Sequence, residues 1–202
     1  NYFPVEEMAA LRAAALGGAP PGTRIEKDKP LTLATGAGVI QSELRVSFAI
    51  PTSPVRLGVT LLGGTRKVDG KAFSTTIAVD FVPSAGLVWN VSATVDQSSM
   101  ACPNFVRGAP PPSLTNRTSC PTRSASLPLK ASDSSLEIAV WTDNLFLEVF
   151  LMGGRLAWTV PLPCEAIVGG AGATAFASGS VQLLNATVTA MGSISYDDTG
   201  DP

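Results

Sequence analysis

The sequence has no histidine among its 202 residues and only three cysteines. Without histidine, the Ser-His and Cys-His pairs that activate catalytic nucleophiles cannot form, and most zinc sites are excluded. The 14 Lys and Arg are outnumbered by 16 Asp and Glu, so no excess positive charge is available to neutralise phosphates. We therefore expect no metal or other cofactor and no nucleic-acid partner.

Long apolar runs are also missing, since no window approaches the roughly 18 uninterrupted apolar residues of a membrane-spanning helix. We expect no membrane span. The chain opens with Asn1 and without a basic and then apolar leader, as a mature or processed fragment would. Three Asn-x-Ser/Thr sequons predict N-linked glycans at Asn90, Asn116 and Asn185. Three sequons together favour a secretory route.

The cysteines are consistent with that route. Cys102 and Cys120 bracket a Pro-rich stretch that would be a floppy loop unless its ends were joined, so we predict a disulfide between them. Cys164 is then left over. It is either a buried small hydrophobe, which is the favoured interpretation, or one half of a bond to another chain.

The start of the chain is expected to be helical. PVEEMAALRAAAL, residues 4–16, puts Pro4 near a first turn, Glu6 and Glu7 at the positive end of the dipole, and apolar side chains along one side. The pair Gly17-Gly18 would end this helix. The sequence thus predicts one short N-terminal helix, followed by a Pro/Gly linker.

Beyond the linker the apolar residues recur with a period of two. In SELRVSFAI, residues 42–50, Leu44, Val46 and Phe48 alternate with Glu43 and Arg45, which is typical of a half-buried strand. Similar β-rich runs, separated by Gly, Pro, Asp and Ser clusters, cover residues 55–62, 73–82, 86–95, 136–141, 145–151, 155–160 and 181–196. Their spacing predicts an all-β, two-sheet antiparallel sandwich.

Two segments of the sandwich have specific expectations. Residues 136–160 should form a three-stranded antiparallel meander, with turns at Asp143-Asn144 and at Gly153-Gly154. GGAGATAF, residues 169–176, is expected to be a flexible loop. Its glycines do not follow a strand into a helix with the dinucleotide pattern, so a phosphate cradle is not expected there.

Carboxylates are the remaining candidates for catalysis, and a glycosidase needs two of them flanking one bond. Asp143 lies in a turn, where its side chain would bond neighbouring backbone groups, and Glu148 faces the same way as Phe146 and Phe150. A lone carboxylate on an aromatic face is most often paired to an arginine, and Arg155 follows the second turn. We therefore expect Glu148 to pair with Arg155 in a structural or interface role rather than to catalyse.

Two stretches resemble a known enzyme family. FPVEEMAALR, residues 3–12, resembles the linker helix that leaves the catalytic propeller of family 32 glycoside hydrolases, the invertases and fructosyltransferases. TDNLFLEVFLMGGR, residues 142–155, is similar to the signature of their C-terminal β-sandwich, in which an aspartate turn precedes a strand ending Glu-x-Phe and then Gly-Gly-Arg. VDQSSM at 95–100 and LLNATVTAMGSISY at 183–196 are weaker likenesses to two further sandwich segments.

The resemblance implies a domain organisation. Residues 1–24 would be the linker helix and connector, residues 25–197 a sandwich of the concanavalin A-like or jelly-roll type, and residues 198–202 a C-terminal tail. In this family the catalytic acids come from a five-bladed propeller, in motifs resembling Asn-Asp-Pro-Asn, Arg-Asp-Pro and Glu-Cys. None of the three occurs here, so this chain itself would carry no catalytic residue.

The resemblance also implies a partner and a location. The chain would be the non-catalytic portion of a retaining β-fructofuranosidase, acting on sucrose or fructans through an N-terminal catalytic propeller that proteolysis has separated and that stays bound. Asp143, Glu148, Phe150 and Arg155 would pack on that propeller. The protein would be extracellular or located in the cell wall or vacuole.

Two other interpretations remain open. A free carbohydrate-binding module would stack sugars on Trp89, Trp141 and Trp158, although each lies in an alternating strand where a core position is favoured. Alternatively, the chain is a structural glycoprotein domain of an extracellular assembly, since a fold does not fix a function.

Overall fold

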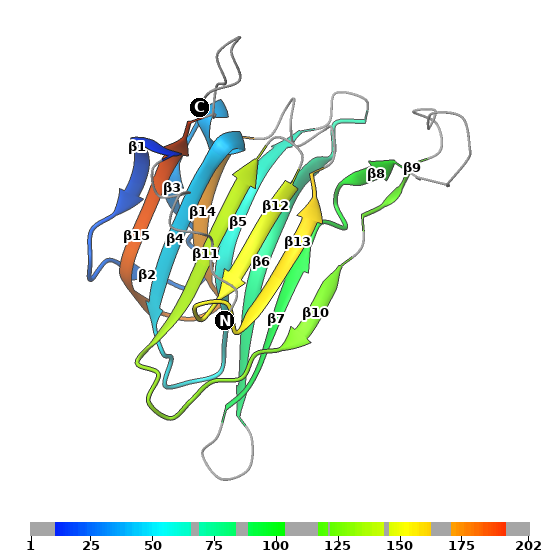
Figure 1. Cartoon of the computed structure of the whole chain (residues 1–202). Coiled ribbons are helices and arrows are strands. Elements are labelled where there is room, and N and C mark those ends of the chain that lie inside the picture. The colour runs from blue at the N-terminus through cyan, green and yellow to red at the C-terminus, as the bar shows by residue number, and fades with distance from the viewer. Residues whose placement is uncertain are drawn as a thin grey trace, which may run out of the picture.

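Two antiparallel β-sheets form the protein, stacked face to face (Figure 1). The computed structural model describes residues 11–65, 69–83, 89–103, 117–120, 122–143, 146–162 and 171–192. Within these ranges there is no α-helix, and η2 (Ala37–Gln41) is a short 3-10 helix. The expected all-β, two-sheet antiparallel sandwich is therefore confirmed.

The seven-stranded sheet faces the viewer in Figure 1. Its order is β1 (Arg12–Ala19), β15 (Val181–Met191), β4 (Ser42–Ala49), β11 (Ser135–Asp143), β12 (Phe146–Leu151) and β13 (Leu156–Pro161), with β2 (Arg24–Ile25) paired to β15. The meander expected for residues 136–160 is confirmed by β11, β12 and β13, which pair in succession.

The six-stranded sheet lies behind it. Its order is β10 (Arg123–Ser126), β7 (Trp89–Asp96), β6 (Ala72–Pro83), β5 (Val55–Thr65), β14 (Ala171–Ala177) and β3 (Leu31–Ala34). A separate two-stranded ribbon joins β8 (Ala101–Pro103) to β9 (Arg117–Ser119). No helix in the described ranges has the length and apolar content needed to span a bilayer.

The core fills the space between the sheets, where alternate residues of facing strands meet. The predicted apolar side of β4 is buried, with Phe48 fully enclosed. Neighbouring and facing strands add fully enclosed side chains of the same kind, namely Leu136, Ile138, Leu57, Ile77 and Phe81. Because each buried aliphatic or aromatic side chain contributes about 1.5 to 3 kcal/mol relative to exposure, this layer supplies most of the driving force for folding.

The expected N-terminal helix is wrong for the part that the structure describes. Residues 12–19 form β1, which pairs antiparallel with β15, while residues 1–10 lie outside the described ranges. A Cβ at Gly17 would lie 2.0 Å from the backbone oxygen of Leu33, and one at Gly18 would lie 2.3 Å from that of Ala186. These glycines therefore allow close backbone approach instead of ending a helix. A short helix gains too little from propensity alone to compete with such pairing.

The expected loop at residues 169–176 is also wrong from residue 171 onward. Ala171–Ala177 forms β14, an inner strand of the six-stranded sheet between β5 and β3. Ala173 and Ala175 are fully buried, while the intervening Thr174 and Phe176 are only partly buried. The segment thus alternates with period two, and its small side chains conceal the pattern.

A close contact in β5 predicts a sharp difference between two glycines. A Cβ at Gly58 would lie 2.0 Å from the backbone oxygen of Ile77, whereas the atoms nearest to a Cβ at Gly63 are 3.6 and 3.7 Å away. We expect Gly58→Ala to lower the free energy of unfolding by at least about 2 kcal/mol, because the neighbouring strand must shift, and Gly63→Ala to change it little. Urea unfolding of both variants measures this, and equal effects would contradict the described β5–β6 register.

Candidate docking face on the seven-stranded sheet

The outer faces of the two sheets differ in their side chains. On the six-stranded sheet, a row of threonines runs in register across four strands: Thr32, Thr174, Thr60 and Thr76. On the seven-stranded sheet, the corresponding kind of row contains two acids and a tryptophan: Glu43, Trp141, Glu148 and Thr159. The second row includes a residue predicted for the site, so this face is the candidate site.

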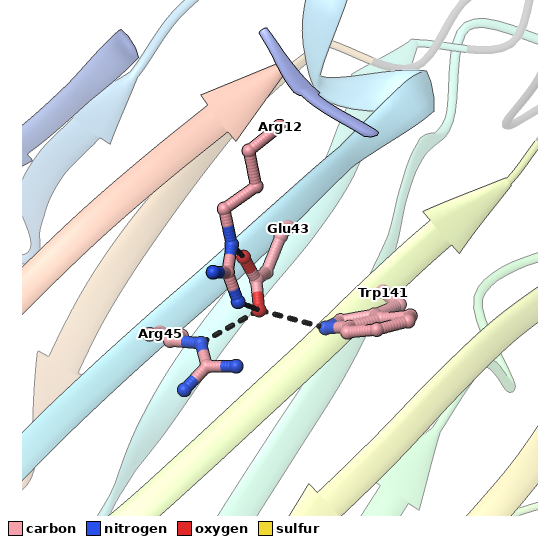
Figure 2. A network of polar contacts seen from close by, with 4 residues as sticks. All are labelled: Arg12, Glu43, Arg45 and Trp141. Carbon is pink, nitrogen blue, oxygen red and sulfur yellow. Dashed lines mark hydrogen bonds and ion pairs between the residues drawn. The ribbon is translucent and has the colours of Figure 1, made fainter. Parts of the chain in front are cut away.

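A buried carboxylate lies at the centre of this face. Glu43 points to the outer side of β4, yet only 2% of it is exposed. Figure 2 shows that side chains from three strands converge on it. The guanidinium of Arg12 donates through Nε to Oε2 and through Nη2 to Oε1 at 2.9 Å. Nε of Arg45 and Nε1 of Trp141 donate to the same Oε1, at 2.6 and 3.0 Å.

The charges in this network reinforce one another. Burial alone raises the pKa of Glu43, but hydrogen bonds from Arg12 and Arg45, together with their positive charge, lower it further than burial raises it. The net pKa of Glu43 therefore lies below its ordinary value, and the same contact raises the pKa of Arg12. Glu43 is ionised at neutral pH and is not a proton donor, so the network holds strands together and does not supply an acid for catalysis.

Removal of this charge is expected to destabilise the fold. Glu43→Gln should lower the free energy of unfolding by about 2 to 3 kcal/mol, because two arginines lose their counter-charge. The loss stays moderate, since the side chains of Arg12 and Arg45 keep 36% and 46% of their surface exposed and regain water. The matched control is Glu137→Gln on the same face, where the carboxylate is exposed and should contribute little. Chemical denaturation measures both, and equal losses would contradict the described network.

Glu148 lies where the sequence predicts but has a different neighbourhood. It shares the outer face of β12 with Phe146, which is 50% exposed, and with the partly buried Phe150. It is directly opposite Trp141 on one side and Thr159 on the other, whose hydroxyl donates to Oε1 at 3.4 Å. Its predicted ion pair with Arg155 does not form.

Arg155 pairs with Asp133 instead. Its Nη1 and Nη2 donate to the two carboxylate oxygens of Asp133 at 2.5 and 2.7 Å, and Nη1 reaches the backbone oxygen of Pro128 at 3.4 Å. The cause is the turn before it, in which Met152, Gly153 and Gly154 all have positive φ values of 51°, 64° and 79°. Three such residues reverse the chain within the hairpin and turn Arg155 toward the loop before β11.

This fork of hydrogen bonds lowers the pKa of Asp133. The hydrogen bonds from Arg155 are the largest cause, followed by one from the backbone N–H of Lys130, and together they bring the pKa from 3.8 to about 2. Because the pKa is lower in the folded state, the pair stabilises the fold at pH values above the unfolded pKa. That stabilisation is lost as the pH falls from about 4 toward 2.

The pH window gives a test of the pair. Asp133→Asn should lower the urea midpoint by a constant amount above about pH 5, and the difference from the unchanged protein should shrink as the pH falls below 4. The matched control is Glu26→Gln, which removes an exposed ion pair with Arg24 of 3.6 Å. We expect this control to leave the midpoint nearly unchanged at every pH. A pH-independent difference for Asp133→Asn would contradict the assigned contact.

The remaining predicted residues are spread over the molecule. Asp143 is exposed at the end of β11, at the opposite end of the meander from Arg155. Asn90 and Asn185 are exposed on β7 and β15, while Asn116 lies outside the described residues. Glycosylation of all three remains a prediction. The four residues predicted to contact a propeller are thus distributed along the meander and do not form one cluster.

The cysteines are described in part. Cys120 is 2% exposed. Its backbone N–H donates to the backbone oxygen of Met100, just before β8, at 3.2 Å. The backbone of Cys102 lies in β8, opposite Thr118 of β9. Cys164 lies outside the described residues, so both expectations for it remain predictions.

The tryptophans serve packing. Trp141 is 6% exposed and meets the ring of Phe150 edge-on, with centroids 6.4 Å apart. Trp89 packs in the same manner on Phe81, with centroids 5.9 Å apart. Trp158 is partly buried against the core. The core interpretation agrees with the structure for Trp89 and Trp158, which pack against the core. Trp141 is instead buried on the outer face of the seven-stranded sheet, where its ring is not available for stacking on a sugar.

The Glu43 network was not predicted from the sequence. Its members Arg12 and Trp141 are 31 and 98 residues from Glu43 in the chain, so only the sheet brings them together. One signal was present, because Glu43 and Arg45 are opposite charges two residues apart and therefore share a strand face. In the described part of the chain, no group of three or more His, Cys, Asp or Glu is arranged to hold a metal.

Comparison with known proteins gives matches in structure only. No protein-family model matches the chain, and no curated protein matches it by sequence. Fructan 1-exohydrolase IIa from Cichorium intybus matches over 94% of this chain, with a TM-score of 0.70 and 15% identity. β-Fructofuranosidase from Schwanniomyces occidentalis matches over 89% with a TM-score of 0.58 and 12% identity, and fructosyltransferase from A. japonicus over 90% with 0.56 and 18%.

The extent of these matches defines what they show. This chain spans only 37%, 34% and 27% of the three solved chains, so it corresponds to about a third of such an enzyme. At identities below 20% the likeness concerns the fold. The chain has the two-sheet sandwich that forms one part of fructan-degrading and fructosyl-transferring enzymes, as the resemblance to family 32 glycoside hydrolases implied.

Proposed function

We propose that this chain is the non-catalytic sandwich portion of a β-fructofuranosidase and that it stabilises a five-bladed propeller carrying the catalytic carboxylates. The observation that carries the proposal is the asymmetry of the structural match: nearly all of this chain aligns with about a third of a fructan exohydrolase. The sequence signature at residues 142–155, which lies on β11, β12 and the turn after them, agrees with it. Sucrose or fructan would be bound and cleaved by the propeller, in a retaining reaction.

The outer face of the seven-stranded sheet is the proposed contact with the propeller. Phe146 exposes half of its surface there, beside Pro161 on the neighbouring strand, and Glu148 lies two residues further along the same face. An exposed aromatic next to a half-buried carboxylate and exposed polar groups is the composition of an interface with an apolar centre and polar rim. Interfaces between domains of one enzyme typically cover about 600 to 1,500 Å².

The network around Glu43 makes this face rigid enough to dock. Trp141 is fixed from one side by its hydrogen bond to Glu43 and supports the ring of Phe150 on the other. Glu148 lies directly opposite Trp141, so its backbone position depends on the same support. A surface whose side chains are held before association loses less conformational entropy when it binds.

A secretory route, N-linked glycans and a disulfide belong to the same proposal. The exposure of Asn90 and Asn185 supports glycosylation, because both amides are accessible. Cys120 is nearly fully buried, and the pairing of β8 with β9 brings Cys102 opposite Thr118, two residues before Cys120. Cys102 is therefore the proposed partner. The bridge would join the ends of the Pro-rich segment, in keeping with an extracellular, cell-wall or vacuolar location.

The test compares two exposed apolar residues on opposite faces. Phe146→Ser on the seven-stranded sheet should weaken association with the propeller by about tenfold or more, because an interface aromatic is lost. Val82→Ser on the six-stranded sheet should have no effect, although Val82 is equally exposed, at 52% against 50%. The measurement is co-expression of this chain with the propeller encoded in the same gene, followed by native mass spectrometry and a sucrose-hydrolysis assay.

Three outcomes separate the alternatives. Loss of binding for Phe146→Ser alone, with normal turnover in the complexes that still assemble, supports the proposed face. Loss of binding for Val82→Ser alone would show that the six-stranded sheet makes the contact with the propeller. A gene that encodes no propeller would reject the enzyme assignment and favour a structural glycoprotein domain.

A further inference from the structure

A shallow pocket lies on the outer face of the seven-stranded sheet, beside the Glu43 network. Its volume is about 210 Å³, which is below the roughly 300 to 1,000 Å³ of sites for drug-sized ligands and suits a single ring. It crosses four adjacent strands, β15, β4, β11 and β12. Its side chains comprise two apolar and four polar residues on the outer face: Ala139, Phe150, Arg45, Ser47, Glu137 and Asn185.

The polar groups of the pocket have hydrogen-bonding capacity left over. Arg45 uses Nε on Glu43, and its two Nη atoms make no hydrogen bond to the described part of the chain. Within the same described residues, the carboxylate of Glu137 and the amide of Asn185 have no hydrogen-bond partner. Donors and acceptors therefore stand around a half-buried aromatic ring, an arrangement that recognises a sugar through its hydroxyl groups and its apolar face.

A β-bulge turns Asn185 into this pocket. Along β15 the pairing with β4 jumps from Leu183 opposite Phe48 to Asn185 opposite Ser47, so one residue is extra. Strict alternation from the buried Leu183 would point Asn185 inward and Ala186 outward. The bulge reverses this, because Asn185 is exposed and Ala186 is 3% exposed. Bulges often serve to re-aim a side chain in this way.

The re-aimed side chain is also the acceptor of a sequon. Asn185-Ala186-Thr187 has the Asn-x-Thr pattern, and Thr187 is exposed on the same face of β15. Asn185 is thus accessible, has no hydrogen bond to the described residues and borders a pocket that fits one ring. Asn90, the other described sequon acceptor, is exposed on the other sheet and is not among the residues of this pocket.

We propose that this pocket is the seat of the first N-acetylglucosamine of a glycan attached to Asn185. The donor is a lipid-linked oligosaccharide pyrophosphate. The amide nitrogen of Asn185 bonds to the anomeric carbon of the sugar and loses one proton, the bond from that carbon to the pyrophosphate oxygen breaks, and lipid pyrophosphate leaves with the electron pair. In the folded protein the ring lies against Phe150, and Arg45 and Glu137 hydrogen-bond its hydroxyl and N-acetyl groups.

This proposal does not depend on a propeller partner. A glycan bound in this pocket would cover the part of the face from Asn185 to Phe150, and would leave Phe146, near the other end of β12, and the neighbouring Pro161 exposed. The docking contact and the glycan therefore divide one sheet face between them. The glycan proposal can fail without affecting the docking proposal, and the reverse, because the rate of glycan release is measured on this chain without a propeller.

The experiment measures how fast each glycan is released. The full chain is produced in a glycosylating eukaryotic host, treated with peptide N-glycosidase, and analysed by glycopeptide mass spectrometry at both sites. In the folded protein we expect release at Asn185 to be at least about tenfold slower than at Asn90, because the linkage is enclosed by the pocket. After unfolding, the release rates at Asn185 and Asn90 should become equal. The rate at Asn185 in the unfolded protein is then the reference for its rate in the folded protein.

Two variants connect the protection to the pocket. Phe150→Ala should bring release at Asn185 to within about threefold of the rate at Asn90. Phe176→Ala, which removes a partly buried aromatic from the outer face of the other sheet, should leave the protection unchanged. If Phe150→Ala fails to fold, Glu137→Ala is the second variant, since Glu137 is exposed and makes no ion pair in the described chain.

Four results would overturn the proposal. The first is an unmodified Asn185 in material where Asn90 carries a glycan. The second is equal release at both sites in the folded protein. The third is protection that neither pocket variant reduces, which would locate its cause elsewhere. The fourth is binding of free fructose or sucrose in this pocket by protein made without glycans, which would assign the pocket to another occupant.

Discussion

The carboxylate of Glu43 is the point on which the candidate site depends. Among the described residues, its side chain alone connects β1, β4 and β11 on the outer face, because Arg12, Arg45 and Trp141 all donate hydrogen bonds to it. A buried charge of this kind is tolerated because two positive charges and a further donor compensate for the water that it loses. Its contribution is to fix the positions of three strands and of the aromatic pair Trp141 and Phe150, on which both the docking face and the sugar pocket rest.

The two proposals use the same face for different purposes. The end of the meander around Phe146 and Pro161 offers an exposed aromatic side chain, which suits a protein partner. The pocket across β15, β4, β11 and β12 instead offers polar groups without hydrogen-bond partners in the described chain, around the half-buried ring of Phe150. The six-stranded sheet differs, because its row of threonines presents only short hydroxyl-bearing side chains. Short side chains give little area for burial, and this favours the seven-stranded sheet as the functional one.

Much of the fold could be predicted because most strands alternate clearly, as in residues 42–50, where large apolar side chains face the core. Two segments could not. In β14 the buried residues are alanines, which carry almost no hydrophobic signal. In β1 the residues are good helix formers, but they pair with the free edge of β15 and form a strand. The strand position of Glu148, on β12, was predicted from the sequence, but its contacts were not. The partner of Arg155 depends on a hairpin with three positive φ values, and the burial of Glu43 depends on residues distant in the chain.

The position of the last two strands has a consequence for biosynthesis. β14 inserts between β5 and β3, and β15 inserts between β1 and β4, so each sheet is completed by the final segment of the described chain. A nascent polypeptide that has emerged only as far as residue 170 would leave backbone groups unpaired along β4 and β5 in both sheets at once. Such open edges invite aggregation, and pairings this distant in sequence form slowly. The sandwich therefore folds only after β14 and β15 have been synthesised, and quality control in the cell has to tolerate an incomplete form until then.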